Sequence, residues 1–244
     1  RWIATEQARA IGSEVEFVLE PPKCGTALAV SVAAHMVKAK RNGGLCLVLA
    51  SDHNLQGRVQ FEGDCRDAAK LAASSHITIF GIEPHHPSSD YGYIEPGATL
   101  FGDKGWSVKR FVEKSNQAHA AELIGSGCLW NSGNMLFDAA VMIGELATSA
   151  PNIADTAQNA FDNAVNDDDR LILPECAAQD LDAISIDYAL LEKTSRAAVV
   201  RASFGWSDMG TWQSVFDLGI KDHSGNVVAE EAQLIDTRDS LVFS

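Results

Sequence analysis

Two runs of the sequence place an acidic side chain soon after an apolar, strand-like segment. Asp52 follows the apolar residues 45–50, and Asp208 lies in a run of two glycines and two tryptophans that follows residues 197–200. In open α/β sheets, ligands bind beyond the carboxyl ends of the strands. A carboxylate there suits Mg²⁺, which prefers oxygen ligands and phosphate. Two structural alternatives stay open, since Asp52 can cap the next helix and the tryptophans can simply pin a turn.

Three further runs bring polar groups to the ends of strand-like segments. Residues 90–94 (DYGYI) lead into one such segment, Glu113 and Lys114 close another, and Asn131 precedes Gly133 in a polar turn. A lysine can bind phosphate, while carboxylate and amide groups can bind hydroxyls. The plain alternatives are a turn, an exposed ion pair worth less than about 1 kcal/mol, and an Asx turn at Asn131.

The segments around these runs alternate between strand and helix patterns. Residues 45–50 and 76–82 have the pattern of buried strands, and residues 26–40 and 58–74 have helical spacing of small and apolar residues. This alternation predicts an α/β fold with a Rossmann-like, mostly parallel sheet and helices on both faces. The continuous apolar run at 45–50 predicts a central strand. From about Pro84, a glycine-rich texture predicts a smaller mixed α/β region over the sheet edge.

The charge and the cysteines restrict the partners. Nineteen basic and thirty-three acidic residues give a formal net charge of -14, which disfavours nucleic acid and anionic membranes. No apolar run approaches the ~20 residues that a membrane span requires. Five dispersed cysteines are typical of reduced thiols in a cytoplasmic protein. We therefore expect a cytoplasmic protein that binds small molecules, and a homo-oligomer is left open.

The motifs, taken in order, resemble bacterial mannose-1-phosphate guanylyltransferases of the type often fused to a phosphomannose isomerase. The likeness extends along almost the whole chain, and an ordered set of this length is specific. It is carried by LEP (19–21), ASDH (50–53), FGI (80–82), GYI (92–94), RFVEK (110–114), WNSG (130–133), SIDYA (185–189), GWSD (205–208) and GTW (210–212).

This resemblance implies a reaction and a fold. The reaction joins GTP and mannose 1-phosphate, giving GDP-mannose and pyrophosphate, by in-line attack at the α-phosphorus assisted by Mg²⁺. The fold is that of a nucleotide-diphospho-sugar transferase, with its smaller mixed region binding the sugar. Residues 1–225 would form the nucleotidyltransferase domain, and residues 226–244 the start of a C-terminal strand or linker region.

The resemblance also assigns roles to individual residues. Asp52 and Asp208 would hold Mg²⁺, and together with Lys114, which would grip the sugar phosphate, they form the catalytic set. Asp187 would order the site from close by. The substrate-binding set is Tyr91, Gly92, Glu113, Asn131, Gly133, Asp187 and Trp206.

Two departures from the family pattern leave other functions open. The family's glycine-rich phosphate loop is not in the sequence, so we expect a domain incomplete at its N-terminus, with a central gap in its sheet. Lys23, Cys24 and Gly25 stand where the family has Gly-Arg-Asn, which removes an Arg and an Asn expected to contact the nucleotide. The alternatives are a nucleotidyltransferase for another hexose 1-phosphate and a non-catalytic nucleotide-sugar-binding relative.

Overall fold

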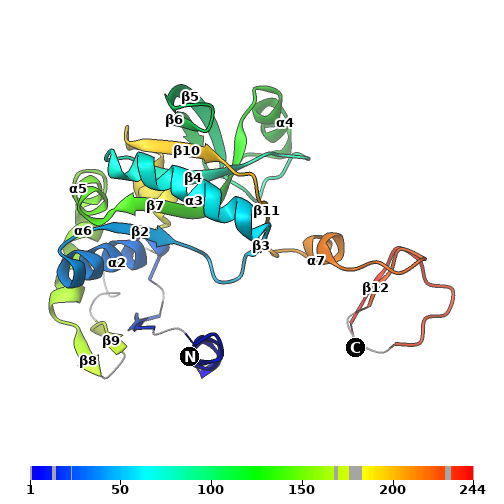
Figure 1. The fold of residues 1–244 in the computed structure, drawn as a ribbon, viewed down its shortest axis with the longest axis horizontal. Coiled ribbons are helices and arrows are strands. Elements are labelled where there is room, and N and C mark those ends of the chain that lie inside the picture. Colours follow the sequence, from blue (N-terminus) through cyan, green and yellow to red (C-terminus); the bar gives the residue numbers. More distant parts are fainter. Residues whose placement is uncertain are drawn as a thin grey trace.

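A six-stranded sheet forms the centre of the computed structural model (Figure 1). The structure describes residues 2–12, 15–22, 24–167, 170–175, 183–228 and 232–243. The spatial order of the strands is β2-β7-β4-β10-β6-β5. Their bounds are Leu45–Val48 for β2, Ile77–Ile82 for β4, Tyr93–Phe101 for β5, Gly105–Val112 for β6, Leu129–Asp138 for β7 and Ala197–Arg201 for β10.

The directions of these strands are mixed. β2 and β4 point the same way, as predicted, but β7 lies antiparallel between them. β10 is parallel to β4, whereas β6 is antiparallel to both β10 and β5. The α/β class is therefore confirmed, while the sheet is mixed rather than mostly parallel. Alternating strand and helix patterns indicate the direction of consecutive strands, but not that a later strand enters between them.

Helices cover both faces of the sheet, as predicted. One face packs against α2 (Thr26–Arg41), α5 (Ala139–Ser149), α6 (Pro151–Asp162) and a π-helix, η2 (Asp187–Leu191). The other face packs against α3 (Arg58–Ala73) and α4 (Gln117–Gly125).

Strand β4 shows how the two cores are separated. Ile77 and Ile79 belong to the cluster under α2 and α5, whereas Phe80 and Ile82 belong to the cluster under α3. All six residues of β4 are buried, as expected for a strand with helices on both faces. The side chains of β4 therefore alternate between the two clusters, although the register of its pairing with β7 shifts between Ile79 and Gly81.

β2 is an edge strand, so its predicted central position is wrong. Leu45 and Leu47 keep 43% and 39% of their surface exposed. β7 pairs with one side of β2, and no strand among the described residues pairs with the other side. The six strands pair without interruption over the described part of the chain, so the expected gap is not in the middle of the sheet; the open position is the β2 edge.

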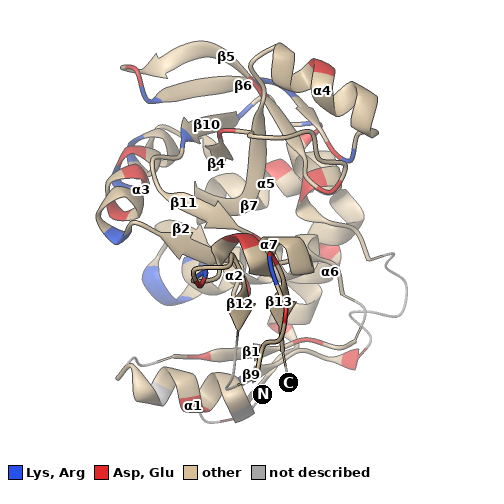
Figure 2. Cartoon of the chain, turned by 90° about the vertical axis from the view of Figure 1, so that its right-hand side faces the viewer, with Lys and Arg blue, Asp and Glu red and all other residues tan. Residues whose placement is uncertain are grey.

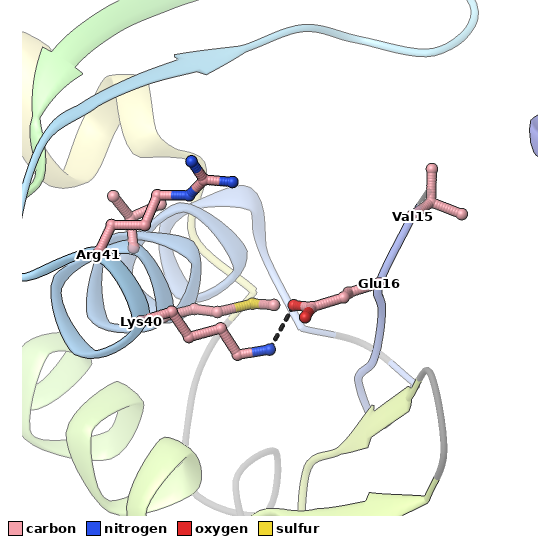
Figure 3. A pocket seen from close by; sticks show the side chains of 6 residues that line it. Val15, Glu16, Lys40 and Arg41 are labelled. Atoms are coloured by element: carbon pink, nitrogen blue, oxygen red, sulfur yellow. Dashed lines mark hydrogen bonds and ion pairs between the residues drawn. The ribbon is translucent and has the colours of Figure 1, made fainter. Parts of the chain in front are cut away.

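A three-stranded sheet lies apart from the main sheet, below α2 in both views (Figure 1 and Figure 2). It contains β1 (Phe17–Leu19), β9 (Arg170–Ile172) and β8 (Val165–Asp167), with α1 (Trp2–Ala10) nearby. A hollow of about 650 Å³ lies between the segment before β1 and the C-terminal turn of α2. An ion pair between Lys40 and Glu16 spans this hollow (Figure 3).

A short antiparallel ribbon and a projecting segment complete the structure. The ribbon pairs β3 (Asn54–Gln56) with β11 (Gly205–Ser207). Beyond it, α7 (Trp212–Leu218) and the paired strands β12 (Val227–Val228) and β13 (Leu241–Val242) extend away from the sheet (Figure 1). Among the described residues, no helix has the length and apolar character needed to cross a membrane.

Candidate active site

The β3–β11 ribbon brings the two predicted metal ligands to the same place. In its register, Ser207 lies opposite Asn54 and Trp206 lies opposite Leu55. Because the strands are antiparallel, the residues just before β3 and just after β11 lie at the same end of the ribbon. Asp208 directly follows β11, and Asp52 lies two residues before β3, on either side of this end of the ribbon.

Asp208 is held from two sides. Its Oδ1 accepts hydrogen bonds from the Tyr91 hydroxyl at 3.0 Å and from the backbone N–H of Gly210 at 3.2 Å. Met209, the next residue, has a φ of 56°, in the left-handed region that few side chains adopt. Oδ2 accepts none of the hydrogen bonds found within the described residues, so it is available to a ligand.

Asp52 is exposed in the turn that follows β2. Helix α3 begins at Arg58 with Gly57 at its N-cap, so Asp52 does not cap that helix. The described residues contain no group of three or more His, Cys, Asp or Glu side chains arranged to hold a metal. Two carboxylates nevertheless fit Mg²⁺, which is usually bound by one or two carboxylates together with waters and substrate phosphates.

Aromatic side chains join the loops that carry these carboxylates. The Trp206 indole N–H donates to Nδ1 of His53 at 3.1 Å, and the Tyr91 ring meets Trp206 edge to face at 5.2 Å. The Tyr91 ring also contacts Trp130 at 4.9 Å. Burial, with the adjacent Asp208 carboxylate, raises the pKa of the Tyr91 phenol. The position of His53 directly after Asp52 was the only sequence signal for its part in this arrangement.

A second group of predicted residues surrounds Asn131. Its Nδ2 donates to Oδ1 of Asp187 at 2.9 Å, and its backbone N–H donates to the Gly92 carbonyl at 2.8 Å. Its Oδ1 accepts from the Gly133 N–H at 3.2 Å, which is the Asx turn left open above. The turn and the contact with Asp187 coexist, because the two use different atoms of the amide.

Glu113 and Lys114 lie at the end of β6 beside this group. Burial and the negative charge of Asp187 raise the pKa of Glu113 to about 7, although Lys114 opposes the shift. Burial also raises the pKa of Asp187. A Cβ at Gly92 would come within 2.6 Å of the Glu113 Oε2, so glycine leaves room for this carboxylate. Lys114 is exposed with a φ of 50°, and within the described residues it forms no ion pair with Glu113.

The two groups form one continuous site. Tyr91 and Gly92 are consecutive, so one loop contacts both Asp208 and Asn131. A Cβ at Gly133 would lie 3.6 Å from the His53 ring, which places the Asn131 turn beside the Asp52 loop. The structure therefore brings the predicted residues together at the ends of β2, β6 and β11 and the starts of β5 and β7.

Two hollows differ in their relation to this site. The hollow of about 650 Å³ beside α2 contains none of the predicted site residues. A smaller hollow of about 120 Å³ is lined by Tyr91, Trp206, Trp130 and the pair His85 and His86. Both histidine rings pack against Trp130, at 4.9 and 5.0 Å, so these histidines have a packing role.

The structure describes two of the three residues that depart from the family pattern. Lys23 lies outside the described residues. Gly25 is the N-cap of α2, and a Cβ there would come within 2.2 Å of the Ile184 carbonyl oxygen. Burial, with the charge of Glu20, raises the pKa of the Cys24 thiol.

This geometry places the chain among α/β proteins that bind ligands at the carboxyl ends of their strands. The Nucleotidyl transferase family matches residues 4–225, and the chain belongs to that family. It is 40% identical to a mannose-1-phosphate guanylyltransferase from Sinorhizobium fredii and 38% identical to the xanthan biosynthesis protein XanB from Xanthomonas campestris. Both alignments cover 100% of the chain but 48% and 52% of the relatives, so the chain spans about half of their length.

Solved structures share the same fold. One, described as a mannose-1-phosphate geranyltransferase from Thermus thermophilus, has a TM-score of 0.79 at 28% identity, over 92% of this chain and 64% of that one. Another, described as a mannose-6-phosphate isomerase from Helicobacter pylori, has a TM-score of 0.76 at 30% identity, over 84% of this chain and 80% of that one.

The environment of Glu113 predicts how stability depends on pH. The folded pKa of about 7 exceeds the ordinary value of 4.5, so the folded protein holds this proton more tightly than the unfolded chain does. The contribution of the protonated Glu113 to the free energy of unfolding is fully present below about pH 4.5, and it is lost as the pH rises through about 7. The melting temperature of Glu113→Gln should therefore exceed that of the wild type by a few degrees at pH 8, with a smaller difference at pH 5.

Thermal melts of both proteins at the two pH values test this expectation. Glu122→Gln, at an exposed carboxylate on α4, is the control, and its offset from the wild type should be the same at pH 5 and pH 8. An equally constant offset for Glu113→Gln would contradict the assignment.

Proposed function

We propose that this protein transfers GMP from GTP to mannose 1-phosphate, giving GDP-mannose and pyrophosphate. The observation that carries the proposal is the β3–β11 ribbon, which brings the loop of Asp52 and the residue after β11, Asp208, to the same end of the ribbon, near the polar group around Asn131. The family match and the relatives named as mannose-1-phosphate guanylyltransferases support the same reaction. We assign this activity to a domain of residues 1–225 and take residues 226–244 as a C-terminal strand or linker region.

The reaction must bring two polyanions together. Mg²⁺, when bound, screens their repulsion and stabilises the charge that develops at the α-phosphorus. Asp52 and Asp208 would hold the cation through their free carboxylate oxygens. Lys114, exposed and without an ion pair to Glu113, would hold the phosphate of mannose 1-phosphate. The sugar phosphate is itself the nucleophile, so the chain contributes position and charge and needs no covalent intermediate.

The sugar would lie in the pocket around Asn131. Glu113 would accept hydrogen bonds from mannose hydroxyls, and the backbone near Gly92 and Gly133 would complete the contacts. Asp187 would act by holding the Asn131 amide through the bond of 2.9 Å. Trp206 would offer a flat apolar face beside the two carboxylates. The dispersed cysteines and the small-molecule substrates are consistent with action in the cytoplasm.

The departure at Lys23–Gly25 supports two alternatives. A changed nucleotide contact there favours either another hexose 1-phosphate or nucleotide, or a relative that binds nucleotide sugars without turnover. One structural relative carries the name of a mannose-6-phosphate isomerase, so isomerisation of mannose 6-phosphate belongs in the same set of assays.

The test of the proposed function is pyrophosphate release with Mg²⁺ across a panel of nucleotides and hexose 1-phosphates, with isomerisation measured in parallel. We expect release with GTP and mannose 1-phosphate. Release with another pair would retain the mechanism and correct the substrate. No release with any pair would favour a binding relative, and isomerisation alone would reject the proposal.

Asp208→Asn should lower the rate of pyrophosphate release by about a hundredfold or more, because it removes a negative charge from the cation site. The amide oxygen can still accept from Tyr91 and Gly210, so the melting temperature should stay near that of the wild type. Steady-state kinetics and thermal melting measure the two effects. A variant with full activity would remove Asp208 from the metal site.

Lys114→Ala should raise the KM for mannose 1-phosphate by about 10- to 100-fold, because a charge-assisted bond to phosphate is lost. The KM for GTP should change little. Lys109→Ala on β6 is the matched control, since Lys109 pairs with Glu95 on the surface, and it should leave both KM values unchanged. Equal losses for both substrates in Lys114→Ala would contradict a selective phosphate contact.

A further inference from the structure

The Tyr91 hydroxyl bonds to the carboxylate that the proposed function assigns to the cation. It donates to Asp208 Oδ1 at 3.0 Å across a large separation in sequence. The same oxygen accepts the Gly210 N–H at 3.2 Å. Both bonds fall on one oxygen, so together they fix the rotation of the carboxylate and leave Oδ2 free.

The Tyr91 ring is itself held in place by two other rings. It meets Trp130 edge to face at 4.9 Å and Trp206 at 5.2 Å. Trp130 is 2% exposed on β7, which makes it a rigid support for the tyrosine ring. The direction of the phenol is therefore set by the sheet and not only by its own loop.

The same rings reach the second carboxylate loop. Trp206 lies two residues before Asp208, and its indole N–H donates to the His53 ring at 3.1 Å. His53 directly follows Asp52. Tyr91, Trp206 and His53 thus form a chain of contacts from one carboxylate loop to the other.

We propose that Tyr91 is a positioning residue for the cation site: its phenol holds Asp208 Oδ1, which leaves Oδ2 as the oxygen that would hold the cation together with Asp52. The proposal rests on the proposed function for the assignment of Asp208 as a metal ligand. It gives Tyr91 a role different from the sugar contact that the resemblance implies. Loss of a hydrogen bond that a neighbouring side chain donates to a metal ligand typically lowers metal affinity or activity 10- to 100-fold.

Tyr93 supplies a matched control. It lies two residues from Tyr91 on β5 and is fully buried, and its hydroxyl bonds only to backbone groups of Ser88, at 2.9 and 3.1 Å, among the described residues. Tyr93→Phe removes a hydroxyl of the same kind that forms no hydrogen bond to Asp208 among the described residues. It should lower the melting temperature, because the buried Ser88 groups lose their partner, while leaving cation binding unchanged.

The experiment measures Mn²⁺ binding to each protein from the loss of the free-ion electron paramagnetic resonance signal. We expect Tyr91→Phe to bind Mn²⁺ about tenfold more weakly than the wild type, and Tyr93→Phe to bind it equally well. In an Asp208→Asn background, adding Tyr91→Phe should weaken binding no further. The Mg²⁺ concentration for half-maximal pyrophosphate release should rise by a similar factor in Tyr91→Phe, with the KM for mannose 1-phosphate nearly constant.

Several results would overturn the proposal. These are unchanged Mn²⁺ affinity in Tyr91→Phe, equal weakening in Tyr93→Phe, absence of Mn²⁺ binding by the wild type, or a rise in the sugar KM without a change in metal dependence. The proposed function is judged separately by wild-type turnover. A wild type without turnover whose Mn²⁺ affinity still falls in Tyr91→Phe would reject the reaction and retain the positioning role.

Discussion

The antiparallel pairing of Trp206 with Leu55 is the constraint on which the site depends. It joins the turn after β2 to the turn after β11, segments that lie far apart in the sequence. Backbone hydrogen bonds in a ladder fix relative position far more tightly than two exposed loops can. Asp52 and Asp208 can therefore face one ligand without any direct bond between them. A site built on such a ribbon keeps its geometry before a charged ligand binds to the exposed Asp52 and the half-buried Asp208.

The site is organised at a cost to stability. Lys114 and Met209 both have left-handed backbone angles, at 50° and 56°, in a region that costs most side chains about 1–3 kcal/mol. Burial and the charge of Asp187 raise the pKa of Glu113 to about 7, so two acidic groups are held near each other. Left-handed angles also occur in turns elsewhere, at Asn42, Ser75, Asp236 and Asp239, so the raised pKa of Glu113 is the feature that sets this region apart. A perturbed pKa of this kind is found more often at sites of binding or chemistry.

Much of this arrangement could be predicted from the sequence, for identifiable reasons. The helical spacing of small and apolar residues predicted α2 to within a residue of its end, and the apolar run of β4 matched a strand buried on both faces. The position of β2 could not be predicted, because a short apolar run has the same pattern at an edge and at the centre. The contacts of Tyr91 and His53 were also hidden, since each depends on a ring from a distant segment. The order of the motifs in the sequence predicted which residues form the site. The hydrogen-bond and ring partners of individual side chains could be seen only in the structure.

Gly25 departs from the family pattern, and it allows a close backbone contact that helps to position another part of the site. A Cβ at this position would lie 2.2 Å from the Ile184 carbonyl oxygen, so only glycine allows this approach. Two hydrogen bonds join the start of α2 to residues 184–186. The Ala27 N–H donates to the Ile184 carbonyl at 3.3 Å, and the Ile186 N–H donates to the Thr26 hydroxyl at 3.0 Å. Asp187 follows immediately and receives the Asn131 amide. The glycine is thus coupled, through backbone packing, to the placement of Asp187, which we propose orders the sugar pocket.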